Sequence, residues 1–527
     1  MVPIRARTGS GAATAPRTAA TATAPTATSS AWCRTTCRRC PATRTRVTRT
    51  RLGATPIART APTTSSSPGA PRRATDRATR SGIRRRRTRT GRSARQAATT
   101  GRIHGGPPGT RSKRRRAGSA MLELALFLAP LLGGDPPPDV IELKRGRKVT
   151  GVILFVGPEE VRIADGSRRK TIRRSEIVSM TGPRLAWPEY VERLRRHFAA
   201  PEATADQAVE LAEWCAAQGL LRDTEFLYLR ALSLDPDQEK ARAALGHVRR
   251  GGDWVVKVGN GGRTTWRRLL ERRLDMDEPW EFSTSHFDVE AAGPLPEILA
   301  AAAELEEVYE AFFRLFQAGV GFHEVLAPME VRIYPDFDAF PALSNNLDSY
   351  FHRQTRILHT YLRDGRASRL QHEAVHELMY FTARELDRKE PSLPGWLEEG
   401  LADYLDSSLD GPPGSLRLEP GRINEELFRD HVTARKRDDL TRVLNYQTTD
   451  FGSSTGQRRR YAESYTLVQF LLHGAGGARA EGLHAFLASA YRGQGSMSHF
   501  KKVFEVRDLD DLDAEWQAWV EANAPKD

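Results

Sequence analysis

Residues 371–380, QHEAVHELMY, place two histidines four positions apart, with a glutamate directly after the first. Because residues i and i+4 lie side by side on a helix, His372 and His376 can present their imidazoles to one ion, and Glu373 is placed to act on water. Neutral imidazole suits zinc, and two ligands preset by a helix reduce the ordering cost. The alternative is a pair of surface histidines that share a helix face.

A second motif, LPGWLEEGLADYL at 393–405, supplies what two histidines lack. A catalytic zinc needs a third protein ligand and keeps its fourth position for water. Glu399 is the candidate ligand, and we expect Glu398 to be solvated. Asp403 lies one helical turn after Glu399, where it can accept a hydrogen bond from a ligating imidazole.

The two motifs, with 22 residues between His376 and Glu399, resemble the gluzincin metallopeptidases, particularly the peptidase-MA-like bacterial proteins and the aminopeptidase-N group. In the W-L-x-E-G-x-A pattern of that group the ligand is the glutamate before glycine, so the resemblance assigns Glu399 rather than Glu398. The E-x-x-x-D of Glu399 and Asp403 is also similar to the thermolysin arrangement. The likeness covers residues 300–500.

The segment YAESYTLVQFLL (461–472) is similar to the one that carries the transition-state tyrosine in aminopeptidase-type gluzincins, which implies Tyr461. Tyr465 is its competitor one turn on, and packing is the alternative role of Tyr461. The G-x-M-E-N element, which aminopeptidases use to hold a free amine, has no counterpart in SYFHRQTRILHTYLRDGR (349–366). An endopeptidase is therefore favoured over an aminopeptidase.

These motifs predict a gluzincin-like metallopeptidase domain at 280–527, of α+β class, zincin-type and mainly helical with a small sheet. Within it we expect a helix at 294–318 and strands at 329–337 and 356–362. Residues 138–184 alternate short β-branched runs with turn signals, which predicts a small domain that is either β-barrel-like or an open sheet. Residues 187–255 are helical in pattern, and LLRDTEFLYLRALSLDPDQEKARAALGHV (220–248) resembles a tetratricopeptide repeat, either a packing adaptor or a site for a protein partner.

The net charge of +14 over 527 residues hides two unlike parts. Residues 1–120 carry 28 Lys and Arg residues and one acid, Asp76, whereas the rest carries 52 basic and 65 acidic residues. Few large apolar residues occur in this leader, so we interpret it as disordered, either a real basic tail or a misplaced start. Nucleic-acid binding is disfavoured because aromatic residues are not interleaved with the arginines.

Residues 121–137 begin with a short apolar run, MLELALFLAPLL, that resembles a signal peptide and is too short to span a bilayer. We therefore favour export to the periplasm or exterior over a cytoplasmic location. The whole pattern predicts a peptidase with one Zn²⁺ per chain, a peptide or protein substrate and Glu373 as general base. The alternative is an inactive zincin-like scaffold that binds protein partners through its barrel and repeat segments.

Overall fold

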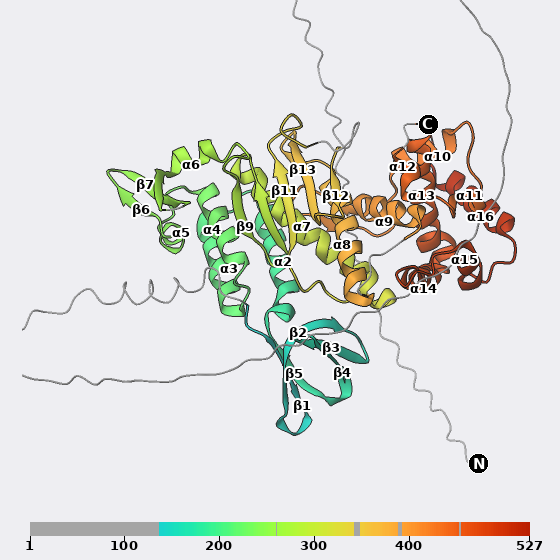
Figure 1. Cartoon of the computed structure of the whole chain (residues 1–527), viewed down its shortest axis with the longest axis horizontal. Coiled ribbons are helices and arrows are strands. Elements are labelled where there is room, and N and C mark those ends of the chain that lie inside the picture. The colour runs from blue at the N-terminus through green and yellow to red at the C-terminus, as the bar shows by residue number, and fades with distance from the viewer. Residues whose placement is uncertain (1–135, 260, 342–347, 388–392, 453–454, 527) are drawn as a thin grey trace, which may run out of the picture. The chain divides into compact units, whose positions relative to one another are not determined.

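The computed structural model describes residues 136–259, 261–341, 348–387, 393–452 and 455–526 (Figure 1). The basic leader (1–120) and most of the signal-like segment (121–137) lie outside these residues. Helices alternate with several small sheets, so the predicted α+β class is confirmed. Among the described helices, none combines the length and the apolar character that crossing a bilayer requires.

The first sheet is built from consecutive antiparallel hairpins in the order β4-β3-β2-β1-β5. Its strands are β1 (Asp139–Leu143), β2 (Lys148–Val156), β3 (Glu160–Asp165), β4 (Arg168–Arg173) and β5 (Ile177–Thr181). Alternating apolar residues point to one face, as the period of a half-buried strand requires. They form a small separate core of Ile141, Leu143, Ile153, Val161, Ile163 and Ile172.

This sheet is not a closed barrel, so of the two forms predicted for 138–184 the sheet is confirmed and the barrel is wrong. β4 and β5 are its two edges, and no ladder between described strands joins them. Because only the short turn η2 (Arg174–Glu176) connects these edges, the sheet has to curl back toward itself. Strand alternation can be read from the sequence, but closure of the sheet depends on whether its edge strands pair. β4 exposes Arg168, Arg169 and Lys170, and charged side chains of this kind are common on edge strands that resist pairing.

Four helices follow: α2 (Pro183–Ala199), α3 (Ala205–Gln218), α4 (Asp223–Leu234) and α5 (Glu239–Ala244). α3 begins with a capping box between Thr204 and Gln207 and ends at Gly219, whose φ of 81° suits a left-handed cap. α3 and α4 pack together as a hairpin. The last residues of the predicted repeat segment (187–255) are instead strands β6 (Val248–Arg250) and β7 (Asp253–Val258), which pair with β8 (Gly262–Thr265) before α6 (Trp266–Arg272).

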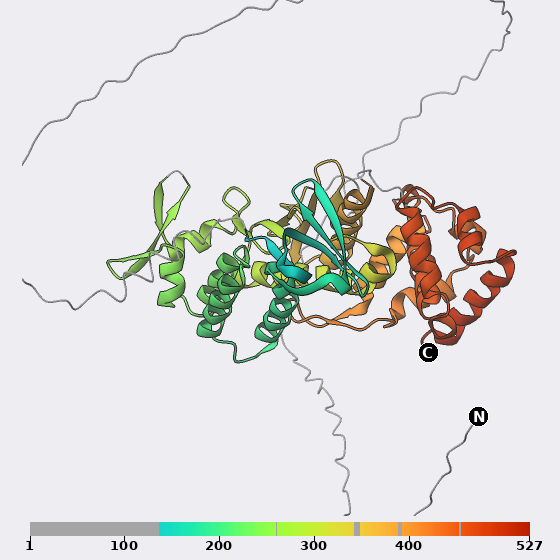
Figure 2. The same cartoon turned by 90° about the horizontal axis from the view of Figure 1, so that it is seen from below.

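The central sheet has the order β12-β13-β11-β10-β9, with β14 (Arg366–Ala367) paired to β13. Figure 1 labels its strands β9, β11, β12 and β13, and Figure 2 shows the same cartoon from below. Its strands are β9 (Trp280–Ser283), β10 (Phe287–Ala291), β11 (Met329–Tyr334), β12 (Tyr350–His352) and β13 (Ile357–Arg363). β10, β11 and β13 are parallel neighbours, and β12 is an antiparallel edge strand. α7 (Leu295–Phe316), which ends in the π-turn η3 (Gln317–Gly321), connects β10 to β11. The helix predicted at 294–318 and the two predicted strands are confirmed.

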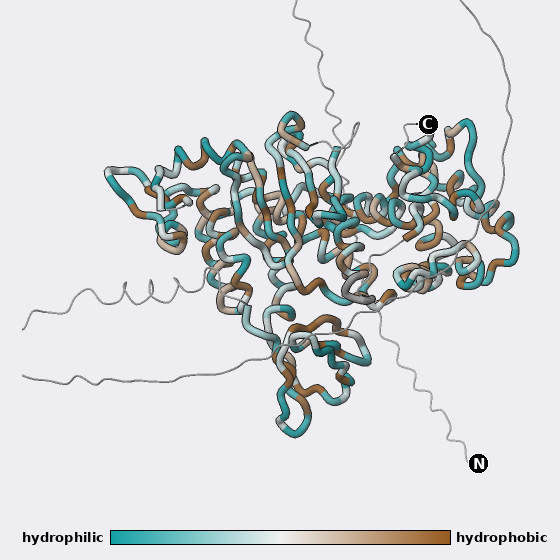
Figure 3. The backbone as a smooth tube through the Cα atoms, viewed as in Figure 1, coloured by the Kyte–Doolittle hydropathy of each residue, from teal (hydrophilic) through white to brown (hydrophobic). Residues whose placement is uncertain are grey.

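The C-terminal half is helical and begins with α8 (Leu370–Asp387) and α9 (Gly395–Ser408). A short hairpin of β15 (Leu409–Asp410) and β16 (Arg417–Leu418) follows. The remaining helices are α10 (Glu425–Thr433), α11 (Leu440–Val443), α12 (Thr448–Phe451), α13 (Gln457–His473), α14 (Ala480–Ala490), α15 (Met497–Val503) and α16 (Leu509–Asn523). Hydrophobic and hydrophilic positions alternate along these elements in Figure 3, as expected where one face is buried. α8 packs on α7, β12 and β13, and α9 packs between α8 and α13.

Candidate metal centre

Two helices bring three ligand atoms to one point. His372 and His376 lie one turn apart on α8, and their Nε2 atoms are 3.1 Å from each other. Glu399 on α9 places its Oε2 atom 3.5 Å from Nε2 of His372 and 3.4 Å from Nε2 of His376. The three predicted ligands therefore lie close enough to hold a metal ion.

The spacing of these atoms fits a tetrahedral ion. Zinc–ligand bonds of about 2.1 Å at tetrahedral angles separate neighbouring ligand atoms by about 3.4 Å. The three observed separations lie within about 0.3 Å of that value. Two imidazoles and one carboxylate leave one coordination position for water or substrate.

Burial and mutual attraction set the charges of the triad. Burial alone would raise the pKa of Glu399, but His376 and His372 lower this pKa below its usual range. Burial would lower the pKa of His376, but the carboxylates of Glu399 and Glu398 raise it well above its usual value. The site thus pairs an ionised carboxylate with two imidazoles whose protonated form the neighbouring carboxylates favour.

Asp403 lies one turn after Glu399 on α9, as the motif predicts. Its Oδ1 atom is 2.9 Å from Nδ1 of His372, the ring nitrogen that points away from the triad. Arg369, which directly precedes α8, approaches the same Oδ1 atom to 3.7 Å. A carboxylate at this nitrogen orients the imidazole and keeps its Nε2 atom available as a ligand.

Glu373 is buried beside the triad at the open edge of the central sheet. Its Oε2 atom accepts a hydrogen bond of 3.0 Å from the backbone N–H of Phe351 in β12. One carboxylate oxygen of Glu373 is therefore tied to the edge strand. The role of Glu373 as general base stays a prediction.

The prediction that Glu398 is solvated is wrong. Only 3% of Glu398 is exposed, and its Oε1 atom lies 3.6 Å from Nδ1 of His376 and forms an ion pair with Arg353. Nearly every residue of α9 is buried, so this helix has no solvent face on which Glu398 could lie. Both acids of the Glu398–Glu399 pair therefore lie at the candidate metal site.

Tyr461 and Tyr465, the two candidates for a phenol donor, occupy different surroundings on α13. The Tyr461 ring lies 6.3 Å from the His372 ring and 5.0 Å from that of Phe451. The Tyr465 hydroxyl is fully buried, accepts from the backbone N–H of Asn424 at 2.8 Å and donates to the Arg422 carbonyl at 3.1 Å. The structure therefore brings Tyr461 to the site and gives Tyr465 a packing role.

Arg353, Phe351 and Arg369 contact the site but were not identified from the sequence. At the edge of the central sheet, Arg353 forms an ion pair with Glu398, and the backbone N–H of Phe351 donates to Glu373. Neither contact follows from a spacing of residues along the sequence. Arg369 has a φ of 47°, an uncommon conformation for a residue with a side chain, and its guanidinium lies 6.0 Å from the Tyr461 ring. The one sequence signal for Arg369 is its position just before the histidine motif.

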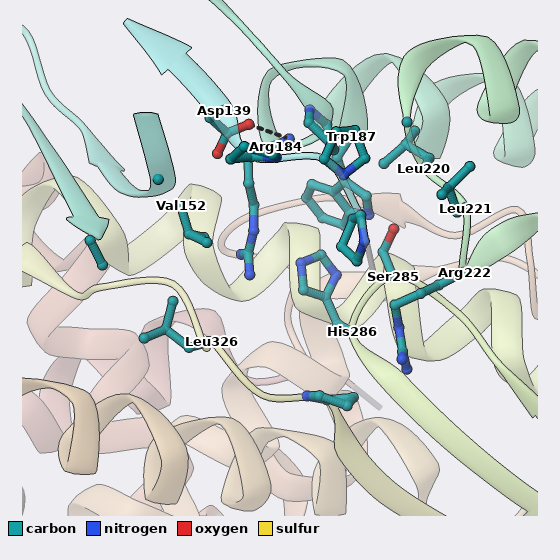
Figure 4. Close-up of a pocket in the computed structure, with 18 of the residues that line it drawn as sticks. Asp139, Val152, Arg184, Trp187, Leu220, Leu221, Arg222, Ser285, His286 and Leu326 are labelled. Atoms are coloured by element: carbon teal, nitrogen blue, oxygen red, sulfur yellow. Dashed lines mark hydrogen bonds between the residues drawn. The ribbon is translucent and has the colours of Figure 1, made fainter. Parts of the chain in front are cut away.

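A cavity of about 550 Å³ lies elsewhere, among the curled sheet, the start of α2 and the loop that precedes β10 (Figure 4). None of the six predicted site residues lines it. Three of its polar lining side chains have close partners: Arg184 with Glu324, Ser285 with Asp223, and His286 with Glu306. This cavity is therefore separate from the candidate metal site and lies at a junction between elements.

Residues 366–492 match the model of a family described as Protein of unknown function (DUF1570). The matched segment contains all three triad residues and also Glu373, Asp403 and Tyr461. No curated protein matches the chain. The chain is thus similar to this family across the candidate site, and the family description states no activity.

Proposed function

We propose that this protein is a zinc-dependent peptidase that hydrolyses internal peptide bonds. The observation that carries the proposal is the convergence of His372, His376 and Glu399 on one point with Glu373 beside them. Zinc is the proposed metal because catalytic zinc favours imidazole and carboxylate ligands and retains an open fourth position. A zinc ion supplies a Lewis acid that polarises an amide carbonyl and makes water acidic enough to react near neutral pH.

The protein's own residues move the protons. Glu373 accepts a proton from the attacking water and returns it to the leaving amine. The hydrogen bond from Phe351 holds the carboxylate while it does so. Tyr461 donates a hydrogen bond to the oxyanion that develops on the substrate, and Asp403 keeps His372 oriented.

The principal alternative is a zincin-like scaffold that has lost catalysis and binds protein partners through its N-terminal sheet and the α3–α4 hairpin. Retention of Glu373 beside a complete ligand set favours the enzyme, because a scaffold has no use for a buried acid at that place. Endopeptidase activity remains favoured because residues 349–366 contain no counterpart of the element that holds a free amine.

Two substitutions separate metal binding from chemistry. We expect the purified protein to contain one zinc per chain by elemental analysis and His376→Ala to lose it. Glu373→Gln should keep the zinc and cleave a peptide library at least about a hundredfold more slowly, the low end for a general base. Glu330→Gln, an exposed acid on β11, is the matched control and should cleave at the normal rate.

Protein that holds no zinc when freshly purified would contradict the metal assignment. Protein that holds zinc but cleaves no peptide in the library would favour the scaffold. Unchanged cleavage by Glu373→Gln would show that the base is misassigned.

A further inference from the structure

A carboxylate from α9 lies near the Nδ1 atom of each histidine of the triad. Asp403 meets Nδ1 of His372 at 2.9 Å, and Glu398 lies 3.6 Å from Nδ1 of His376. Because both Nε2 atoms face the triad, these Nδ1 atoms are the nitrogens left to interact with the protein. A carboxylate at Nδ1 fixes the ring and its tautomer, so that Nε2 presents its lone pair to a metal.

Glu398 needs a counter-ion because it is almost completely buried. An isolated carboxylate in such a place is costly, whereas a paired one is tolerated. Arg353 supplies the pairing charge through its contact with Oε1 of Glu398, and Thr448 donates a long hydrogen bond of 3.5 Å to Oε2. The position of Glu398 behind His376 therefore depends on a residue of the turn that follows β12.

The same short stretch of chain contacts both acids of the site. The backbone N–H of Phe351 holds Glu373, and two residues later Arg353 holds Glu398. The edge of the central sheet therefore contacts α8 through Glu373 and α9 through Glu398. A shift of this stretch would move the predicted general base and the support of His376 together.

We propose that Arg353 and Glu398 are positioning residues that hold His376 in the orientation needed to bind the metal, with Arg353 acting through Glu398. The inference rests on the metal site of the proposed function and not on its reaction. Neither residue is required to touch a substrate.

The test is the zinc dissociation constant, measured on the full chain by competition with a chromophoric chelator. Glu398→Gln, which keeps an acceptor but loses the charge, should weaken zinc binding by about tenfold, the low end for the loss of such a support. Arg353→Met should weaken binding by a similar factor, because Glu398 is then free to turn away from His376. Arg353→Lys, which keeps the charge, should recover most of this loss.

The double variant Arg353→Met/Glu398→Gln decides whether the two residues act as one unit. If Arg353 acts through Glu398, the double variant should bind zinc within about twofold of Glu398→Gln alone, because residues in one network are not additive. Arg356→Met removes an exposed arginine from the same turn and should leave the zinc affinity unchanged. The visible spectrum of the cobalt-substituted protein should shift in Glu398→Gln and not in Arg356→Met, which separates a change in ligand geometry from a general loss of stability.

Zinc affinities of Glu398→Gln and Arg353→Met within twofold of the parent protein would overturn the inference. So would a full tenfold effect of Arg353→Met in the Glu398→Gln background, since Arg353 would then act by another route. A parent protein that binds zinc but cleaves no peptide would contradict the proposed reaction and leave this inference standing. A parent protein that binds no zinc would overturn both.

Discussion

At the scale of single residues, Tyr461 differs from Tyr465 by what surrounds the hydroxyl group. Burial raises the pKa of Tyr461, and Glu399 and Asp403 raise it further, so the phenol keeps its proton and can donate it in a hydrogen bond. Tyr465 already uses its hydroxyl to tie α13 to Arg422 and Asn424. The two residues should therefore respond differently to loss of the oxygen atom.

We predict that Tyr461→Phe lowers kcat about a hundredfold and leaves KM and zinc content nearly unchanged. A donor aimed at a developing oxyanion contributes roughly 3 kcal/mol, and mainly in the transition state. Tyr465→Phe should retain most of the rate and instead lose about 1–3 kcal/mol of unfolding free energy, because buried polar groups lose their partner. Steady-state kinetics and denaturant unfolding measure both effects. A reversal of the two kinetic results would show that the predicted register is wrong by one helical turn.

At the scale of elements, the close approach of α9 and α13 holds the site together. α9 carries Glu399 and Asp403, and α13 carries Tyr461. The helices touch at Gly400, where an added Cβ would lie 2.6 Å from the Ser464 carbonyl oxygen and 2.9 Å from Cγ2 of Val468. Packing therefore requires a glycine directly after Glu399.

We predict that Gly400→Ala forces the two helices apart. The added methyl group should lower the free energy of unfolding by about 1–3 kcal/mol, as overpacking does, and should also weaken zinc retention because Glu399 moves with α9. Gly452→Ala is the matched control: its Cβ would meet only the Thr449 carbonyl oxygen at 3.8 Å, and its φ is −76°. That control should be neutral or stabilising by up to about 1 kcal/mol. Equal effects of the two substitutions on stability would contradict the packing argument.

The elements also explain which parts of the site were predictable. His372, His376 and Glu373 share one helix, and Glu399 and Asp403 share another, so their relations follow from helical spacing. Glu398 sits in the same motif, but its burial depends on the helices that pack around α9, which no local pattern reports. The contacts of Arg353 and Phe351 depend on the position of an edge strand. Whether the first sheet closes into a barrel was unpredictable for a related reason, since strand alternation does not show whether two edge strands pair.

At the scale of the whole molecule, α7 connects distant segments through three buried acids. Glu304 accepts a hydrogen bond of 2.6 Å from Gln371, which directly precedes His372 on α8. Glu306 binds His286 and the Trp187 indole of α2. Through α7, these contacts link α8, which carries the two histidines, to α2.

Glu307, the third acid, joins α7 to the β15–β16 hairpin and to α2. It accepts a hydrogen bond of 3.1 Å from the backbone N–H of Leu416, and Nε of Arg195 lies 3.4 Å away. Burial raises the pKa of Glu307 to about 8, with a smaller contribution from Glu304, although Arg195 and the backbone N–H groups of Leu416 and Gly414 favour the ionised form. The desolvation cost thus outweighs the neighbouring cation.

A raised pKa in the folded state makes stability depend on pH. Folding favours the protonated form of Glu307, so this stabilising contribution is complete below the ordinary pKa of 4.5 and is lost as the pH rises through about 8. Glu307→Gln cannot ionise. We therefore predict that the unfolding free energy of Glu307→Gln, relative to the parent protein, increases by at least about 1.4 kcal/mol between pH 5 and pH 8, the equivalent of one pKa unit.

Denaturant unfolding at several pH values, with the metal removed by a chelator throughout, measures this difference without the pH dependence of metal binding. Val308→Ala removes buried volume from the same turn of α7 without a titrating group, so it should lower stability by a similar amount at every pH. Parallel curves for Glu307→Gln and the parent protein would show that Glu307 is already ionised at pH 5. In that case Arg195 would outweigh burial, and α7 would be tied to α2 by a buried ion pair rather than by a neutral acid.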